Sequence, residues 1–221
     1  MILIFAKVPA VEECDCYDQT TSTPHDLVDF LKSKIEYLAM TGPMLPRERS
    51  EYSAIVDRPP LKLPGGARMI VWTIVNLEVW DISKPMARQV LPAPTGVPLL
   101  PDVPNWSWHE YGMRVGVWRF FDLYKKLGIV PTLSINARVC EDYPRVAREA
   151  KDAGWEFMGH AYEQGPIHKE ADQKAMIARS MNVIEKFTGK RPVGWLGPGL
   201  TQTLETPENL EIGRASCRER V

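Results

Sequence analysis

The chain has 221 residues, of which 44% are hydrophobic and 25% are charged, and its formal net charge is −1. This composition is typical of a soluble globular protein with enough apolar material for a core. The near-neutral charge gives no electrostatic reason to expect nucleic acid or an anionic membrane as a partner. No apolar run is long enough to span a bilayer, and the apolar start lacks the basic region of a signal peptide.

The cysteines favour a cytoplasmic location. There are 4 of them, too few and too scattered for a disulfide framework, and the C-x-C pair lacks the second pair of a zinc site: Cys14, Cys16, Cys140 and Cys217. We therefore expect reduced thiols in a cytoplasmic protein. The sequence leaves open whether the protein forms a homo-oligomer.

Residues 1–51 are predicted to form an N-terminal arm and not a domain. Apolar residues repeat there at helical spacing after a Thr-Pro start signal, at Leu27, Leu31, Ile35 and Leu38. Gly42 would end this helix, and Pro and Gly residues between 59 and 66 interrupt the chain just before the first strand.

Strands and helices are predicted to alternate from residue 68 onward. The strands expected from apolar runs are 69–75, 130–135, 155–159 and 193–196, and the helices are 113–127, 144–153 and 177–187. A long Pro-rich segment, 81–108, joins the first strand to the first helix and is of the kind that forms a lid or binding loop. Short, nearly unbroken apolar strands alternating with helices indicate a parallel sheet covered by helices.

Polar or small groups follow each of these apolar runs. They include Asn76 and Glu78, Asn136, His160, and the Gly197-Pro198-Gly199 segment. In a parallel sheet or a β/α barrel the carboxyl ends of the strands converge on one face, where such folds hold their active sites. The sequence therefore predicts one site at that face.

The last segment, 211–221, differs in composition from 201–210, which has the pattern of a helix about to begin. One permitted choice of codons for 211–221 spells a widely used sequencing adapter. We interpret the segment as a non-native tail on a truncated reading frame, with a natural basic tail as the alternative.

Three segments carry a resemblance to a known family: 73–79, 160–164 and 194–198. The run from about Tyr52 to Leu210 resembles the polysaccharide deacetylase (NodB-homology) family. The resemblance implies an α/β fold, a distorted β/α barrel with fewer strands than the eight-stranded type. Residues 52–210 would be its N-terminal part, and the barrel would be incomplete.

The departures from the family pattern concern the metal. In the family one Asp is the general base, while another Asp and two His bind a divalent ion. Here Glu78 stands at the position of the base, but Val79 and Gln164 replace two metal ligands and leave His160. An aliphatic group and an amide cannot replace a carboxylate and an imidazole around such an ion. The pattern resembles the metal-independent, allantoinase-like branch of the family.

The resemblance thus implies a hydrolase of non-peptide C–N bonds that needs no cofactor and acts on a small amide or ureide. Glu78 would be the base and His160 the acid or the group that polarises the carbonyl. The expected substrate-binding residues are Asn76, Asn136, Tyr162 and Trp195, whereas His109 and Tyr111 are interpreted as residues at the start of a helix.

Two alternatives stay open. One is a deacetylase of N-acetyl sugars that uses zinc or another divalent metal, with Asp81, His160 and His168 as ligands. The other is a non-catalytic member of the family whose cleft only binds.

Truncation would affect stability. A barrel that stops after about four strands leaves strand edges unpaired, so we expect this chain to be marginally stable and inactive although its full-length parent is an enzyme. Expression of Met1 to Leu210 beside the full reading frame tests this expectation.

Overall fold

The computed structural model describes residues 45–93 and 95–215. The helix predicted around Leu27 to Leu38 lies outside the described residues, as do Cys14, Cys16 and Cys217. The chain divides into two units, Met1–Pro60 and Leu61–Val221. The described part of the first unit contains one short 3-10 helix, η1 (Ile55–Asp57).

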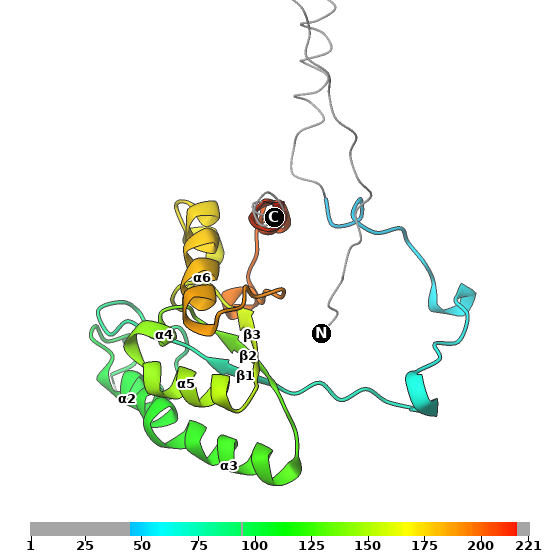
Figure 1. Cartoon of the computed structure of the whole chain (residues 1–221). Coiled ribbons are helices and arrows are strands. Elements are labelled where there is room, and N and C mark those ends of the chain that lie inside the picture. The colour runs from blue at the N-terminus through cyan, green and yellow to red at the C-terminus, as the bar shows by residue number, and fades with distance from the viewer. Residues whose placement is uncertain (1–44, 94, 216–221) are drawn as a thin grey trace, which may run out of the picture. The chain divides into compact units, whose positions relative to one another are not determined.

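The second unit holds the strands and the α-helices (Figure 1). Its strands are β1 (Ile74–Leu77), β2 (Thr132–Ile135) and β3 (Glu156–Gly159). Its α-helices are α2 (Val103–Tyr111), α3 (Val117–Leu127), α4 (Val139–Asp142), α5 (Pro144–Asp152), α6 (Gln173–Thr188) and α7 (Thr206–Ala215). A π-helical segment, η3 (Gly112–Gly116), joins α2 to α3, and the 3-10 helices are η2 (Pro64–Gly66), η4 (Ile167–Lys169) and η5 (Pro198–Leu200). None of the helices in the described ranges is long and apolar enough to cross a bilayer.

The strands form one parallel sheet in the order β1-β2-β3. Leu77 pairs with Ile135, and Ile135 pairs with Gly159, so the carboxyl ends of the strands lie level with one another. The α/β class with parallel strands is therefore confirmed. Whether the barrel is complete, and whether the chain is truncated, stay predictions.

The predicted fourth strand is present only as a parallel bridge between Gly159 and Trp195. The Gly159 N–H donates to the Gly194 carbonyl at 3.0 Å, and the Leu196 N–H donates to the Gly159 carbonyl at 2.9 Å. These two bonds still bring the 194–196 segment beside the carboxyl end of β3, which is the end of the sheet where the sequence predicts the site.

The prediction for the first strand was wrong at its start. Residues 69–73 are not part of β1, and Met69, Ile70 and Val71 are 71–77% exposed. The ladder with β2 begins only where the Thr132 N–H donates to the Thr73 carbonyl at 3.0 Å, so residues 69–72 have no partner strand in the described part of the chain. An apolar run without a partner does not become a strand.

Helix α2 was also missed, because its Pro was interpreted as a breaker. Pro104 lies in the first turn, where its missing N–H costs nothing, and the Asp102 carboxylate caps the helix by accepting from the Asn105 N–H at 3.2 Å. The Pro-rich connection therefore ends at residue 102. Asn105 also holds that connection, since its side-chain oxygen accepts from the N–H groups of Val90 and Leu91 at 2.8 Å each.

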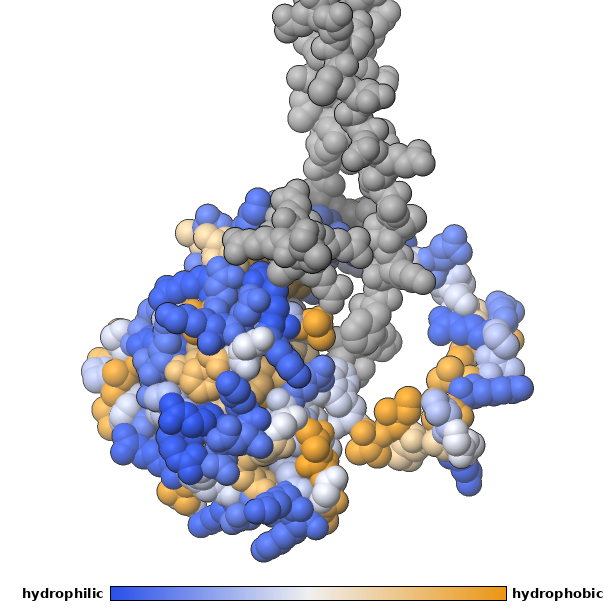
Figure 2. Space-filling view, viewed as in Figure 1, coloured by the Kyte–Doolittle hydropathy of each residue, from blue (hydrophilic) through white to orange (hydrophobic). Residues whose placement is uncertain are grey.

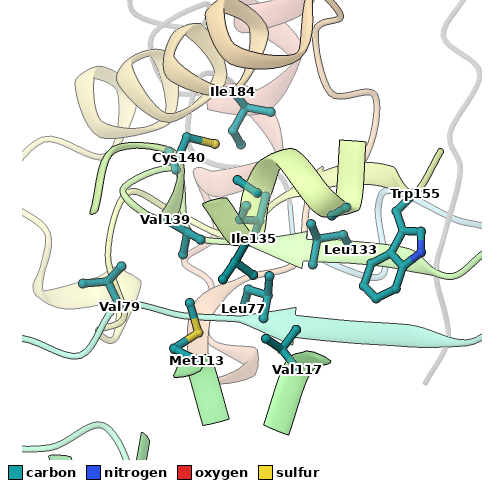
Figure 3. Packing of buried hydrophobic residues seen from close by; sticks show 14 of the residues in the cluster. Leu77, Val79, Met113, Val117, Leu133, Ile135, Val139, Cys140, Trp155 and Ile184 are labelled. Carbon is teal, nitrogen blue, oxygen red and sulfur yellow. The ribbon is translucent and has the colours of Figure 1, made fainter. Parts of the chain in front are cut away.

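The core lies between the sheet and its covering helices. Leu77 on β1 and Leu133 and Ile135 on β2 belong to one cluster of buried hydrophobic residues. The cluster also includes residues of η3, α3, α5 and α6. The outer surfaces of these helices are largely hydrophilic in the view of Figure 2. Figure 3 shows Leu77 and Ile135 at the centre, with Met113 and Val117 on one side and Ile184 on the other. The intervening strand residues, such as Asn76 and Ser134, belong to the opposite face because strand side chains alternate.

The helix expected after 201 is confirmed as α7, which begins at Thr206 and runs to Ala215. It therefore passes beyond Leu210, where we placed the start of a non-native tail. The origin of 211–221 stays a prediction, and residues 216–221 lie outside the described part of the chain.

Gly197 provides a test of the turn that follows the 194–196 segment. A Cβ at this position would lie 2.1 Å from the Thr201 carbonyl oxygen, so the backbone would have to move. We expect Gly197→Ala to lower the free energy of unfolding by about 1–3 kcal/mol or more, measured by urea denaturation. Gly165→Ala is the control, because its Cβ would meet nothing within 4 Å. Equal stability of the two variants would contradict the turn geometry.

Candidate active site

The Glu78 side chain lies directly after β1 and is 19% exposed. The Trp80 indole N–H donates to its Oε2 at 2.7 Å, two residues further along the chain. The carboxylate is thus held by a neutral donor and stays partly open to solvent. This arrangement suits a group that must exchange protons.

His160 follows β3 and faces Glu78. Its ring is only 2% exposed, with Nδ1 2.7 Å from the Leu196 carbonyl oxygen and Nε2 3.5 Å from Glu78 Oε1. A carbonyl can only accept, so Nδ1 carries a proton. Nε2 has no hydrogen-bond partner among the described residues. A second proton on Nε2 gives an imidazolium facing a carboxylate, whereas an unprotonated Nε2 would place two acceptors opposite each other.

The surroundings lower the pKa of Glu78 below its ordinary value of 4.5. Burial alone would raise this pKa, but the interaction with the His160 ring and the hydrogen bond from Trp80 outweigh it, with smaller charge contributions from His160 and His109. Glu78 is therefore ionised at neutral pH, as a general base must be.

Asn136 joins the two chain segments that carry this pair. It is fully buried, and its side-chain oxygen accepts from the Val79 N–H at 2.9 Å while its side-chain nitrogen donates to the His160 carbonyl. A further contact of 3.4 Å runs to Gln164 Oε1. The predicted substrate-binding amide is thus occupied within the protein, and its geometry is that of a residue that positions Glu78 and His160.

The backbone directly after His160 is strained. Ala161 has a φ of 63°, a left-handed conformation that is uncommon for a residue other than glycine. Its carbonyl accepts from the Ala137 N–H at 2.9 Å, and the Tyr162 carbonyl accepts from the Arg138 N–H at 3.0 Å. These bonds hold the turn that ends β3 at His160. Such strained residues cluster at functional sites.

The other predicted substrate-binding residues differ in placement. Asn76 lies on β1 and is exposed. The Tyr162 hydroxyl donates to Glu141 at 2.6 Å, and its ring lies under Arg179 at 3.5 Å, so it is engaged with α4 and α6. Trp195 packs its ring against Gly159, and its buried indole N–H has no acceptor in the described part of the chain.

The alternative metal ligands do not assemble. Asp81 accepts from Ser83 at 2.7 Å and pairs with Lys84 at 3.7 Å, while His168 is exposed on η4. Among the residues that the structure describes, no three His, Cys, Asp or Glu side chains are grouped to hold a metal ion.

The two positions where the resemblance places other ligands do not fit a metal either. The Val79 side chain is in the core, 5% exposed, and the Gln164 amide oxygen faces Asn136. The donor set at this site therefore does not suit a divalent ion.

Two residues of the site were not foreseen from the sequence. His109 lies near the end of α2 and not at a helix start, is 7% exposed, and has its Nε2 2.7 Å from the Glu78 carbonyl oxygen. Trp80 stacks on the His109 ring, with centroids 5.1 Å apart. A His directly after a Pro-rich stretch gives no periodic signal that could indicate this contact.

Comparisons with known proteins indicate the family that this chain resembles. Residues 108–211 match the family described as polysaccharide deacetylase. The peptidoglycan deacetylase of Helicobacter pylori is 30% identical over 87 residues, which cover 38% of this chain and 30% of that protein. This chain therefore spans less than a third of the curated relative's length.

Solved structures show the same relationship. The crystal structure of Puue allantoinase superposes with a TM-score of 0.60 and 26% identity, over 73% of this chain and 58% of that one. A probable polysaccharide deacetylase from Pseudomonas aeruginosa PAO1 gives a TM-score of 0.55 and 25% identity, over 70% and 54% of the two chains. The family match over residues 108–211 and these two structures confirm the resemblance noted from the sequence.

Proposed function

We propose that this site hydrolyses a non-peptide C–N bond in a small amide or ureide without a metal, with Glu78 as base and His160 as acid. The observation that carries the proposal is the pair itself, a carboxylate with a lowered pKa and an imidazole whose Nδ1 is tied to a carbonyl. The likeness to an allantoinase structure supports a ureide.

The reaction follows from the protons that the pair holds. The Glu78 carboxylate takes a proton from a water molecule, whose oxygen attacks the carbonyl carbon of the substrate. The negative charge moves to the carbonyl oxygen. When the C–N bond breaks, the leaving nitrogen receives a proton from His160 Nε2, and the proton held by Glu78 returns the pair to its starting state. Each acid–base step of this kind contributes about 10²–10⁴-fold.

The developing oxyanion needs fixed donors. Asn136 is not available for this role, because its amide nitrogen donates to the His160 carbonyl and contacts Gln164 Oε1 at 3.4 Å. The Trp195 indole N–H is buried and without an acceptor in the described ranges, and Asn76 is exposed on β1, two residues before Glu78. We assign substrate contact to these two residues.

Metal independence makes a separate prediction. Purified protein should contain substoichiometric zinc and other divalent ions by elemental analysis, because Val79 and Gln164 supply no ligands. His168→Ala is the matched variant, since it removes a residue of the alternative ligand set. Stoichiometric metal that is lost in His168→Ala would favour the deacetylase instead.

A panel of substrates tests the function. The panel should hold cyclic and linear ureides beside N-acetylglucosamine oligomers, since the Helicobacter pylori relative is named a peptidoglycan deacetylase. Each is assayed with and without a chelator. Turnover of a ureide that survives the chelator is the expected result. Chelator-sensitive release of acetate would identify the metal-dependent alternative, and saturable binding without turnover would identify the non-catalytic one.

A further inference from the structure

His109 contacts the segment that carries Glu78 in two ways. Its Nε2 is 2.7 Å from the Glu78 carbonyl oxygen. Since a carbonyl only accepts, Nε2 must carry the proton. The bond joins α2 to the end of β1 across 31 positions of sequence, and so holds the backbone that bears the base.

The second contact runs through Trp80. The His109 ring stacks on the Trp80 indole with an interplanar angle of 21°, and that indole donates to Glu78 Oε2 at 2.7 Å. The backbone and the carboxylate of Glu78 are therefore both fixed by groups that His109 supports. Trp80 and His109 are each 7% exposed, so neither ring has room to swing away.

His109 is itself held by the helix that carries it. The next residue, Glu110, is 5% exposed, accepts from Arg114 Nε at 2.7 Å, and accepts from the Tyr143 hydroxyl at the start of α5. Burial would raise the pKa of Glu110, but the bonds from Tyr143 and Arg114 outweigh it and lower the pKa. His109 Nδ1, 3.8 Å from Glu110 Oε1, has no hydrogen-bond partner among the described residues.

We propose that His109 is a positioning residue for the hydrolysis, which sets the place of the Glu78 carboxylate through the Glu78 carbonyl and the Trp80 indole. The proposal rests on the proposed role of Glu78. It assigns a function to α2, which the sequence led us to treat as part of a loop. It also explains why a buried His is present where an aliphatic residue would pack at no polar cost.

Two variants distinguish the contribution of the His109 N–H donor from that of the packing of its ring. In His109→Gln the side-chain amide can place its N–H near the position of Nε2, whereas His109→Leu fills the space without a donor. Trp108→Leu is the control, because Trp108 also packs beside Trp80, at 6.2 Å between centroids, but is 49% exposed. Each variant is made in the full 221-residue chain.

The first measurement needs no substrate. The Trp80 indole proton, assigned with Trp80→Phe in ¹⁵N-Trp-labelled protein, should move as Glu78 is titrated, with a midpoint below pH 4.5 in the wild type. The midpoint should rise most in His109→Leu, less in His109→Gln, which loses the charge but keeps a donor, and stay near the wild-type value in Trp108→Leu. An unchanged midpoint in His109→Leu, or equal shifts in Leu and Gln variants that both fold, would overturn the proposal.

The second measurement uses the substrate that the panel identifies. His109→Leu should lower kcat by roughly ten- to a hundredfold with little change in KM, and His109→Gln should restore most of it. A rise in KM with kcat unchanged would overturn the positioning role. If neither this chain nor the full reading frame expected from the sequence turns over a substrate, the proposed function fails, but the titration still reports on His109.

A third measurement covers the case in which His109→Leu does not fold. Long-range ¹H–¹⁵N spectra of the wild type should show His109 protonated at Nε2 and His160 protonated at Nδ1. A His109 ring protonated only at Nδ1 cannot donate to the Glu78 carbonyl and would overturn the proposal.

Discussion

Replacing Glu78 with Gln should lower kcat by about 10²–10⁴-fold and leave the fold intact. The amide has the shape of the carboxylate, and its oxygen can still accept from the Trp80 indole, which now donates at 2.7 Å. It cannot take a proton from water. The comparison is made from kcat and KM on the substrate that the panel identifies, with thermal unfolding as the check on folding.

Glu163→Gln is the matched control for Glu78→Gln. Glu163 follows β3 and pairs with Arg138 at 2.9 Å and with Lys84, so it tests the loss of a charge at the same end of the sheet without touching the proposed chemistry. It should keep most of the activity. Full activity in Glu78→Gln, or equal losses in both variants, would remove Glu78 from the role of base.

The pH dependence of stability and of kcat is a second test of the role of Glu78. The pKa of Glu78 is lowered in the folded protein, so its ionisation stabilises the fold above about pH 4.5 and this contribution is lost as the pH falls through the folded value. The acid limb of kcat that belongs to Glu78 should therefore lie below pH 4.5 in the wild type.

The position of the site could be predicted from the sequence, because it depends on strand order and not on side-chain detail. Glu78 and His160 follow separate apolar runs, and a parallel sheet brings the ends of such runs together. The structure places the two groups 3.5 Å apart. The number of residues between Glu78 and His160 does not predict this distance, which depends on β1 and β3 lying in the same parallel sheet.

The remaining features of the site depend on hydrogen bonds that a pattern of residue types does not reveal. Asn136 follows β2 just as His160 follows β3, yet its amide is consumed by the Val79 N–H and the His160 carbonyl. Tyr162 is two residues from His160, but the strained turn at Ala161 directs the chain so that its hydroxyl meets Glu141. The position of a residue directly after a strand predicts where its side chain lies. Its hydrogen-bond partners determine whether that side chain can contact the substrate or instead holds neighbouring residues in place.

The strand ends illustrate the same distinction. Residues 69–73 are as apolar as the residues of a strand, but pairing with β2 begins only where the Thr132 N–H meets the Thr73 carbonyl. At 193–196 the run is apolar and correctly placed, yet it contributes only a bridge to Gly159. Local hydrophobicity predicts which segments approach the sheet, and the ladder of its neighbour decides how many residues pair.

Replacing His160 with Asn should lower kcat by about 10²–10⁴-fold, because the proposed acid is lost while the fold is kept. The side-chain nitrogen of Asn lies near the position of Nδ1 and can still donate to the Leu196 carbonyl, which His160 now meets at 2.7 Å. Nothing then stands at Nε2. His160→Gln is the comparison, since its amide lies nearer the position of Nε2 and gives up the bond to Leu196.

The His160 variants also have a stability signature with a definite sign. Burial raises the pKa of Glu78, and His160 is one of the groups that lower it. Removal of His160 therefore raises the pKa of Glu78. The stability that the wild type gains from ionised Glu78 at neutral pH is then reduced, and below the wild-type pKa, where Glu78 is protonated in both proteins, that difference disappears. The free energy of unfolding of His160→Asn should therefore differ from the wild type more at pH 7 than at pH 4. A difference that does not change with pH would mean that Glu78 and His160 do not share their protons as proposed, and the acid–base assignment would fail with it.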